Sequence, residues 1–187
     1  MGRARGDAKR AGTGPGSNQE IDEDRIIDRF KRLGRQRRAL QVTLRPFGDG
    51  ERLDPREWEQ GFTSADPEVI AQVVAVTGAY QMLVNHLMEM LQSACRLAGL
   101  EACRGNTRPS GPDLIKAVVS DGGLTDHQMD VLLRLYRTRN ALQHSSPGVQ
   151  ANDLREDIEL LQKTLVRFVK SYLDWLKRYE VHIVPDQ

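Results

Sequence analysis

The chain has 187 residues, of which 39% are hydrophobic and 28% charged, and its 27 basic and 26 acidic side chains give a formal net charge of +1. This balance excludes a protein that binds nucleic acid through bulk charge, so any site for a polyanion must be local. No stretch approaches the roughly 18 uninterrupted apolar residues of a membrane span, and the basic, glycine-rich N-terminus lacks the apolar core of a signal peptide. We therefore expect a cytoplasmic protein without membrane segments, built as one compact domain with extensions.

The first third of the chain predicts a tail, a helix and a long connection. Residues 1–19 are polar and glycine-rich, too poor in apolar side chains to offset the entropy of ordering, and predict a disordered tail. Residues 20–66 predict a helical extension and linker: a helix whose acids come first and whose arginines follow, then a weak strand-like alternation over 40–44. A surface connection follows, with Trp58 and Phe62 as its anchors.

The compact domain is expected over 67–187. Helix-capping signals mark the starts of three helices: Asp66-Pro67, Ser110 with Asp113, and Thr125 with Gln128. The first of these helices is about thirty residues long and ends at Gly99, and a last long helix carries an apolar stripe from Leu154 to Tyr179. The pattern predicts an all-α protein, an up-down bundle of four main helices with an additional N-terminal helix.

The cysteines and histidines do not form a metal site in the sequence. Cys95 and Cys103 are too few for a disulfide framework and are expected to be reduced thiols in the core. None of His86, His127 and His182 has a cysteine or carboxylate at ligand spacing. We expect neither a metal nor another cofactor.

One segment near the end of the third of these helices has an unusual composition. It contains no acidic residue between Val131 and Asn152, and it carries three arginines: Arg134, Arg137 and Arg139. The apolar stripe also breaks, because Asn140 and Gln143 stand at inward positions. Asn140 and His144 are four apart and share a helix face, whereas Arg139 and His144 are roughly 140° apart, so they share a pocket only if the helix end distorts or Arg139 reaches around. A polar cluster that merely caps the helix explains the same residues.

The order of elements gives this segment a context. A long helix, a short helix ending in a glycine turn, a helix ending in Arg139-Asn140-Ala-Leu-Gln-His144 and a long amphipathic helix resemble the HEPN superfamily of helical nucleotide-binding and ribonuclease domains. The resemblance covers about residues 67–180. It implies metal-independent endonucleolytic cleavage of RNA by a homodimer whose two motifs face each other across a cleft, in a toxin or defence effector with a possible protein inhibitor as partner.

The residue types suit that chemistry. A histidine changes its protonation near neutrality, so we expect His144 to act as acid and base when a ribose 2′-hydroxyl attacks the adjacent phosphate. A guanidinium matches phosphate oxygens in a fork, so we expect Arg139 to clamp the phosphate and Asn140 to orient the site. Arg137 and Arg134 are expected to contact the RNA backbone.

Two alternatives remain at this stage. The same fold can serve as a non-catalytic adaptor that binds a nucleotide, RNA or a protein, and burial of His144 against Trp175 or Tyr172 would favour that interpretation. The run Arg29–Arg38 carries six cations and no acid, which suits RNA phosphates, although a solvated helix face explains it equally well.

Overall fold

The computed structural model describes residues 15–49, 52–104, 109–144 and 149–180. These ranges are helical, as predicted, and their only β pairing is an isolated bridge between Gly48 and Leu53. The α-helices are α1 (Pro15–Leu44), α2 (Pro55–Thr63), α3 (Pro67–Leu97), α4 (Gly111–Ser120), α5 (Asp126–Gln143) and α6 (Ala151–Leu176). Short 3-10 turns follow three of them: η1 (Arg45–Phe47), η2 (Glu101–Cys103) and η3 (Lys177–Tyr179).

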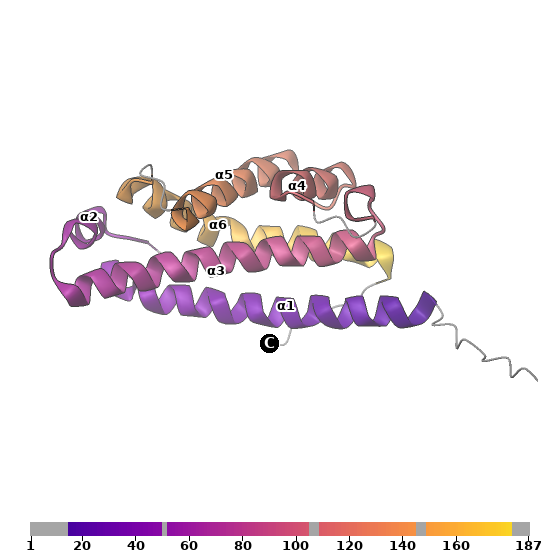
Figure 1. Cartoon of the computed structure of the whole chain (residues 1–187), viewed down its shortest axis with the longest axis horizontal. Coiled ribbons are helices and arrows are strands. Elements are labelled where there is room, and N and C mark those ends of the chain that lie inside the picture. The colour runs from indigo at the N-terminus through magenta and orange to yellow at the C-terminus, as the bar shows by residue number, and fades with distance from the viewer. Residues whose placement is uncertain (1–14, 50–51, 105–108, 145–148, 181–187) are drawn as a thin grey trace, which may run out of the picture.

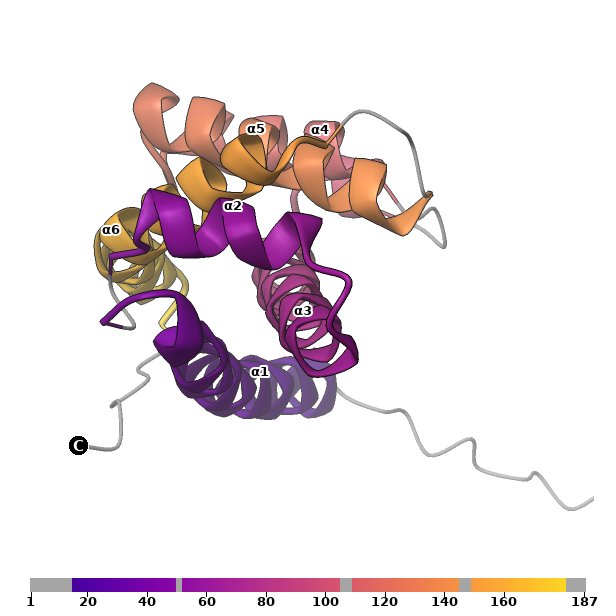
Figure 2. The ribbon, with the colours of Figure 1, turned by 90° about the vertical axis from the view of Figure 1, so that its left-hand side faces the viewer.

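The helices form three layers. The two longest, α1 and α3, lie side by side along the length of the molecule (Figure 1), and they form the most extensive helix–helix contact in the fold. Viewed from the end, α1 forms the bottom layer, α3 and α6 the middle layer, and α4 and α5 the top layer (Figure 2). The short helix α2 contacts both α3 and α6 and closes one end.

Side-chain caps begin three helices at the predicted positions. At the start of α5 the Thr125 hydroxyl accepts a hydrogen bond from the Gln128 backbone N–H (3.2 Å), and the Gln128 side chain accepts one from the Thr125 backbone N–H (2.9 Å). At the starts of α3 and α4, the Asp66 and Ser110 side chains each accept one hydrogen bond, from the Glu68 and Asp113 backbone N–H groups respectively. Helix α3 ends where Gly99 adopts a φ of 64°, a left-handed conformation that glycine favours. The capping predictions are confirmed.

The N-terminal helix is longer than predicted at both ends. It begins at Pro15, within the expected tail, and it continues through 40–44, where a strand-like segment was expected. The strand prediction is wrong: Leu40 and Leu44, one helical turn apart, are both buried, whereas Val42, which a strand would place on the same face as them, is 55% exposed. The remainder of the expected tail, residues 1–14, lies outside the described residues.

The connection after α1 is partly helical and is anchored as predicted. Asp54 caps α2, and Trp58 on that helix is only 1% exposed. The indole Nε1 of Trp58 donates to the backbone carbonyl of Ala151 at the start of α6 (2.6 Å). The rings of Phe47 and Phe62 each pack 5.2 Å from the Trp58 ring, between centroids. The expectation of an irregular surface loop is therefore corrected, because a capped helix presents the tryptophan to the core.

The core lies where the stripes of α3 and α6 meet. Tyr172 of α6 is fully buried, and its hydroxyl donates to the Met90 carbonyl of α3 (3.0 Å). Cys95 and Cys103 are buried thiols, and burial followed by contact with Cys103 raises the pKa of Cys95. No cluster of metal-ligating side chains occurs in the described ranges.

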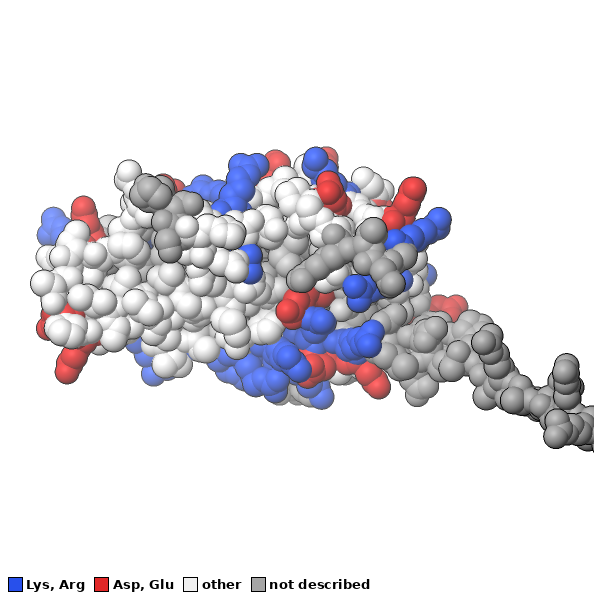
Figure 3. Space-filling model, viewed as in Figure 1, with Lys and Arg blue, Asp and Glu red and all other residues white. Residues whose placement is uncertain are grey.

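The first two thirds of α3 expose an apolar surface. No lysine, arginine, aspartate or glutamate occurs between Glu68 and Glu89. The exposed apolar residues of this stretch are Ile70, Ala71, Val74, Ala75 and Met82, here called the uncharged face of α3; Gln72 is also exposed on this stretch. It belongs to the broad surface without charges in Figure 3. By length and composition, α3 is the one helix in the described part of the chain that could cross a membrane.

Asp121 joins the end of α4 to the end of α6. Its carboxylate accepts hydrogen bonds from the Trp175 indole (2.7 Å) and the Tyr179 hydroxyl, and its backbone carbonyl accepts one from Arg178 (2.8 Å). Burial alone would raise the pKa of Asp121, but the two side-chain hydrogen bonds and the charge of Arg178 outweigh it and lower the pKa.

Asp121→Asn is expected to lower the free energy of unfolding at pH 7 by about 1.5 kcal/mol, because hydrogen bonds to a charged acceptor are stronger than those to a neutral one. Since the folded-state pKa lies below the usual 3.8, the contribution is complete above that pH and disappears as the pH falls through the folded-state pKa. Urea unfolding at several pH values measures this, with the exposed Asp130→Asn as control. If the difference in free energy of unfolding between the wild type and Asp121→Asn is as large at pH 2 as at pH 7, the assignment is wrong.

Candidate functional site

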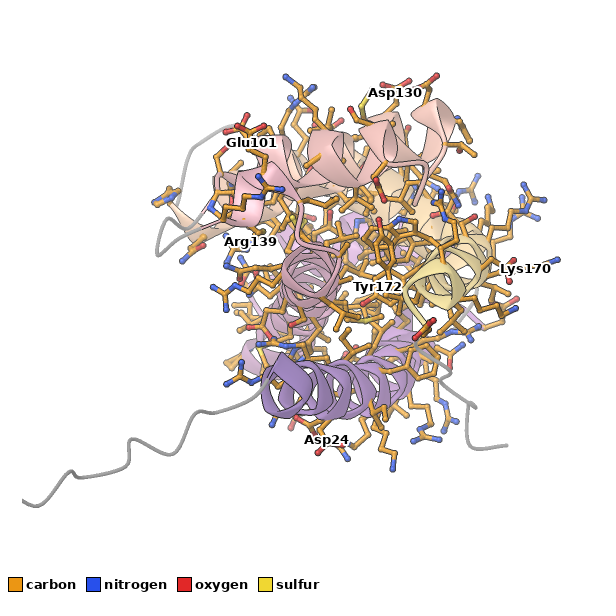
Figure 4. The ribbon with its side chains drawn as sticks, turned by 90° about the vertical axis from the view of Figure 1, so that its right-hand side faces the viewer. Asp24, Glu101, Asp130, Arg139, Lys170 and Tyr172 are labelled. Atoms are coloured by element: carbon orange, nitrogen blue, oxygen red, sulfur yellow. The ribbon has the colours of Figure 1, made fainter. Side chains whose placement is uncertain are left out.

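Arg139 is held by its neighbour Asn140. The Arg139 Nη1 donates to the Asn140 Oδ1 (2.7 Å), and both side chains are partly buried. Figure 4 shows Arg139 between α3 and the top layer, on the side of the molecule opposite Lys170. The amide oxygen thus orients the guanidinium without neutralising its charge.

The Arg139 side chain lines a pocket of about 220 Å³ between α3, α4 and α5. The lining residues are Asn85, Met88, Glu89 and Gln92 of α3, Pro109, Gly111 and Leu114 at the start of α4, and Tyr136 and Arg139 of α5. Sequence reasoning missed the contribution of α3. The sequence does contain a pattern that indicates this contribution. A polar stripe lies beside the apolar stripe of α3, with residues spaced by four and three positions: Asn85, Glu89 and Gln92.

Gly111 shapes the wall of this pocket. A Cβ atom at Gly111 would lie 2.3 Å from the Tyr136 ring, closer than any atomic contact permits. The glycine therefore lets the Tyr136 ring of α5 lie directly against the first turn of α4. This close approach sets the spacing between the two helices beside Arg139.

The charge of the pocket depends on how its carboxylate is paired. Glu89 forms an ion pair with Arg29 of α1, and the His86 ring nitrogen lies 3.4 Å from the same Glu89 oxygen. Arg139 has no carboxylate partner among the residues that the structure describes. The pocket therefore presents a guanidinium and the Asn85 and Gln92 amides, which suit an anion such as a phosphate.

His144 stands where α5 ends. Its φ of −95° and ψ of 13° leave the helical region, and its backbone N–H donates to the Asn140 carbonyl (3.1 Å). The His144 side chain is exposed. Trp175 and Tyr172 bond instead to Asp121 and Met90. The burial that would have favoured a non-catalytic adaptor is thus not observed.

The three motif residues are linked through Asn140. The Asn140 side chain bonds to Arg139, and its backbone carbonyl bonds to His144. His144 does not line the Arg139 pocket. Because the helix ends at Gln143, the 140° separation of an ideal helix no longer determines where the His144 ring points. Gln143 itself is exposed, so it is not the inward residue that the stripe predicted.

Arg134 and Arg137 line a different groove. This groove, of about 430 Å³, lies between α5 and α6. Arg134 pairs with Asp157 and with Glu156 (3.1 Å), and the hydrogen bond to Glu156 above all raises the pKa of Arg134. The two arginines therefore lie on another side of α5 from Arg139, and the structure does not bring the five predicted site residues into one pocket.

The Arg134 ion pair is part of the core packing. Asp157 is only 1% exposed, and the Tyr80 hydroxyl beside it donates to the Leu135 carbonyl (3.1 Å). Burial, and next the negative charge of Asp157, raise the pKa of Tyr80. Arg134 supplies the positive charge that makes a buried carboxylate tolerable at this junction of α3, α5 and α6.

Arg134→Ala is expected to reduce the free energy of unfolding by about 3 kcal/mol, because it leaves the Asp157 carboxylate buried without its ion-pair partner. Arg137→Ala, at an exposed position of the same groove, should change stability by less than about 0.5 kcal/mol. Urea denaturation of the two variants measures the difference. Equal stabilities would show that the Arg134–Asp157 pair is dispensable.

Comparisons of the chain with protein-family models, with curated proteins and with solved structures find no match. The function is therefore inferred from three residues of the site. Arg139 has no carboxylate partner in the described ranges, and the Asn140 amide orients its guanidinium. His144 is exposed at the end of the same helix.

Proposed function

We propose that this protein is a metal-independent endoribonuclease of the HEPN type, a toxin or defence effector that cleaves RNA. The observation that carries the proposal is the Arg139 guanidinium, which is oriented by Asn140 while the nearby Glu89 is paired with Arg29. The proposal takes α3 to α6 as the four-helix up-down core of that family, with α1 and α2 as additions.

The chemistry needs a cation and a proton carrier. The ribose 2′-oxygen forms a bond to the adjacent phosphorus and the P–O5′ bond breaks, so one proton leaves the 2′-hydroxyl and another reaches the departing 5′-oxygen. Arg139 stabilises the negative charge that develops on the phosphorane oxygens. His144 accepts the first proton when neutral and donates the second when protonated.

A second copy of the chain would complete this site. Each chain carries one motif histidine, whereas simultaneous acid and base catalysis uses two. The uncharged face of α3 suits a symmetric contact, because the same apolar patch meets itself across a two-fold axis without charge repulsion. Asn85 follows Met82 by three residues and lines the Arg139 pocket, so this face runs directly into the site.

Cleavage of total RNA in EDTA tests the activity. His144→Ala and Arg139→Ala are each expected to reduce the cleavage rate at least about 100-fold, since each removes a group that acts in the transition state. His127→Ala is the matched control, because it removes an exposed histidine from the same helix. Full activity in either site variant, or activity that requires a divalent metal, would refute the proposal.

Val74→Lys tests the dimer. Val74 is 64% exposed on the uncharged face of α3, and a buried lysine at a symmetric contact would oppose its own copy. We expect the wild type to have twice the 21.1 kDa mass of one chain in light scattering, and Val74→Lys to be monomeric and inactive. Val166→Lys, at a 59% exposed valine of α6, should remain dimeric. A monomeric wild type, or association with membranes in place of a dimer, would contradict this interface.

A non-catalytic adaptor is the second candidate, and the same uncharged face favours it. An exposed apolar surface of this kind also suits a different protein partner. The adaptor predicts that the wild type does not cleave RNA in any buffer and that Val74→Lys abolishes binding of that partner, whereas His144→Ala does not.

A further inference from the structure

We propose that the outer face of α1 binds the sugar-phosphate backbone of the RNA at a second site, separate from the Arg139 pocket. The residues are Lys31, Arg35 and Arg38 of α1 and Arg45 of the turn η1 that follows it, here called the basic stripe. This inference rests on the proposed function for the identity of the RNA ligand. The binding surface itself follows from the charges and packing of α1.

The sequence of α1 and η1 concentrates positive charge in a stretch that contains no acidic residue. Seven cations and no acid occur between residues 29 and 48: Arg29, Lys31, Arg32, Arg35, Arg37, Arg38 and Arg45. The four residues of the basic stripe follow one another by four, three and seven positions and are all exposed. Side chains at this spacing share one side of a helix, so their charges add along a single line.

Few carboxylates neutralise these cations. Arg29 pairs with Glu89, and Arg32 pairs with Asp28 one turn earlier (2.8 Å). Arg35, Arg38 and Arg45 pair with no carboxylate within the described ranges. Three guanidinium groups, two on α1 and one on η1, are therefore exposed without a carboxylate partner in the described ranges.

The packing of α1 determines which partner suits this face. Between residues 24 and 44, the side chains of Ile26, Leu33, Leu40 and Leu44 are buried in the core and Val42 is the one large exposed apolar side chain, so this described stretch of α1 has no apolar face for insertion into a membrane surface. The stripe is rich in arginine, whose planar fork matches two phosphate oxygens at once. A phosphate backbone is the polyanion that this pattern fits best.

The basic stripe and the Arg139 pocket lie on different sides of α1. Arg29 of α1 reaches the Glu89 carboxylate of α3, and Glu89 lines the Arg139 pocket. At about 100° per residue, the α1 residues of the stripe lie about 120–180° around the helix from Arg29, so the stripe faces away from the pocket. In Figure 3 the basic side chains gather along the lower edge of the molecule, where α1 lies. The stripe would therefore bind the RNA backbone as a separate contact.

Fluorescence anisotropy with a labelled 20-nucleotide single-stranded RNA tests the basic stripe, in a His144→Ala background so that the RNA stays intact. Adding Arg35→Gln and Arg38→Gln is expected to weaken binding at least about tenfold and to reduce the slope of log affinity against log salt by about 1.4, or about 0.7 for each phosphate contact. The matched control adds Lys116→Gln and Lys170→Gln, which remove the same charge from exposed positions of α4 and α6. This control should bind as the background does.

Equal binding by the Arg35/Arg38 variant and its control overturns the basic stripe, and so does a wild-type chain that binds no RNA. Circular dichroism verifies that each variant is folded. The failure of the proposed function has a separate signature: wild-type protein does not cleave RNA, while the loss of binding on Arg35→Gln and Arg38→Gln persists. In that case α1 still binds RNA, and the chain is an adaptor.

Discussion

The ion pair between Arg29 and Glu89 determines the electrostatics of this molecule. It joins α1 to α3 across the largest helix contact of the fold, and it pairs the carboxylate that lines the Arg139 pocket. With Glu89 compensated from α1, the Arg139 guanidinium is bonded to a neutral amide and keeps its full charge for a ligand. The proposed chemistry depends on this arrangement.

Two arginines on different sides of helix α5 have different roles. Arg134 faces the α5–α6 groove, where it compensates the buried Asp157, while Arg139 faces α3 and α4. A run of arginines that looks uniform in the sequence is thus divided into a residue that stabilises the core and a residue that faces a pocket. The division follows from the 100° rotation per residue, which places neighbouring positions on different surfaces.

Exposed apolar surface is the second organising feature. The uncharged face of α3 runs into the pocket through Asn85, so one exposed apolar surface borders the candidate site. A helix that buries only part of its apolar side chains costs free energy in water, and association with a second copy removes that cost. Assembly and activity would therefore be coupled in this protein.

The sequence by itself predicted α3 to α6 and most of their ends, since capping interactions such as Thr125 with Gln128 and the stop at Gly99 are local. It missed α2 and both ends of α1, and the burial of Trp58 on α2 and of Leu44 at the end of α1 depends on packing against the core. It also identified Arg139, Asn140 and His144 as candidate site residues, because their spacing and the absence of acids are visible in the chain. Only the tertiary structure decided which carboxylate meets which arginine, and that Glu89 and the α3 amides border Arg139. Contacts between helices distant in the sequence depend on packing, which no local pattern encodes.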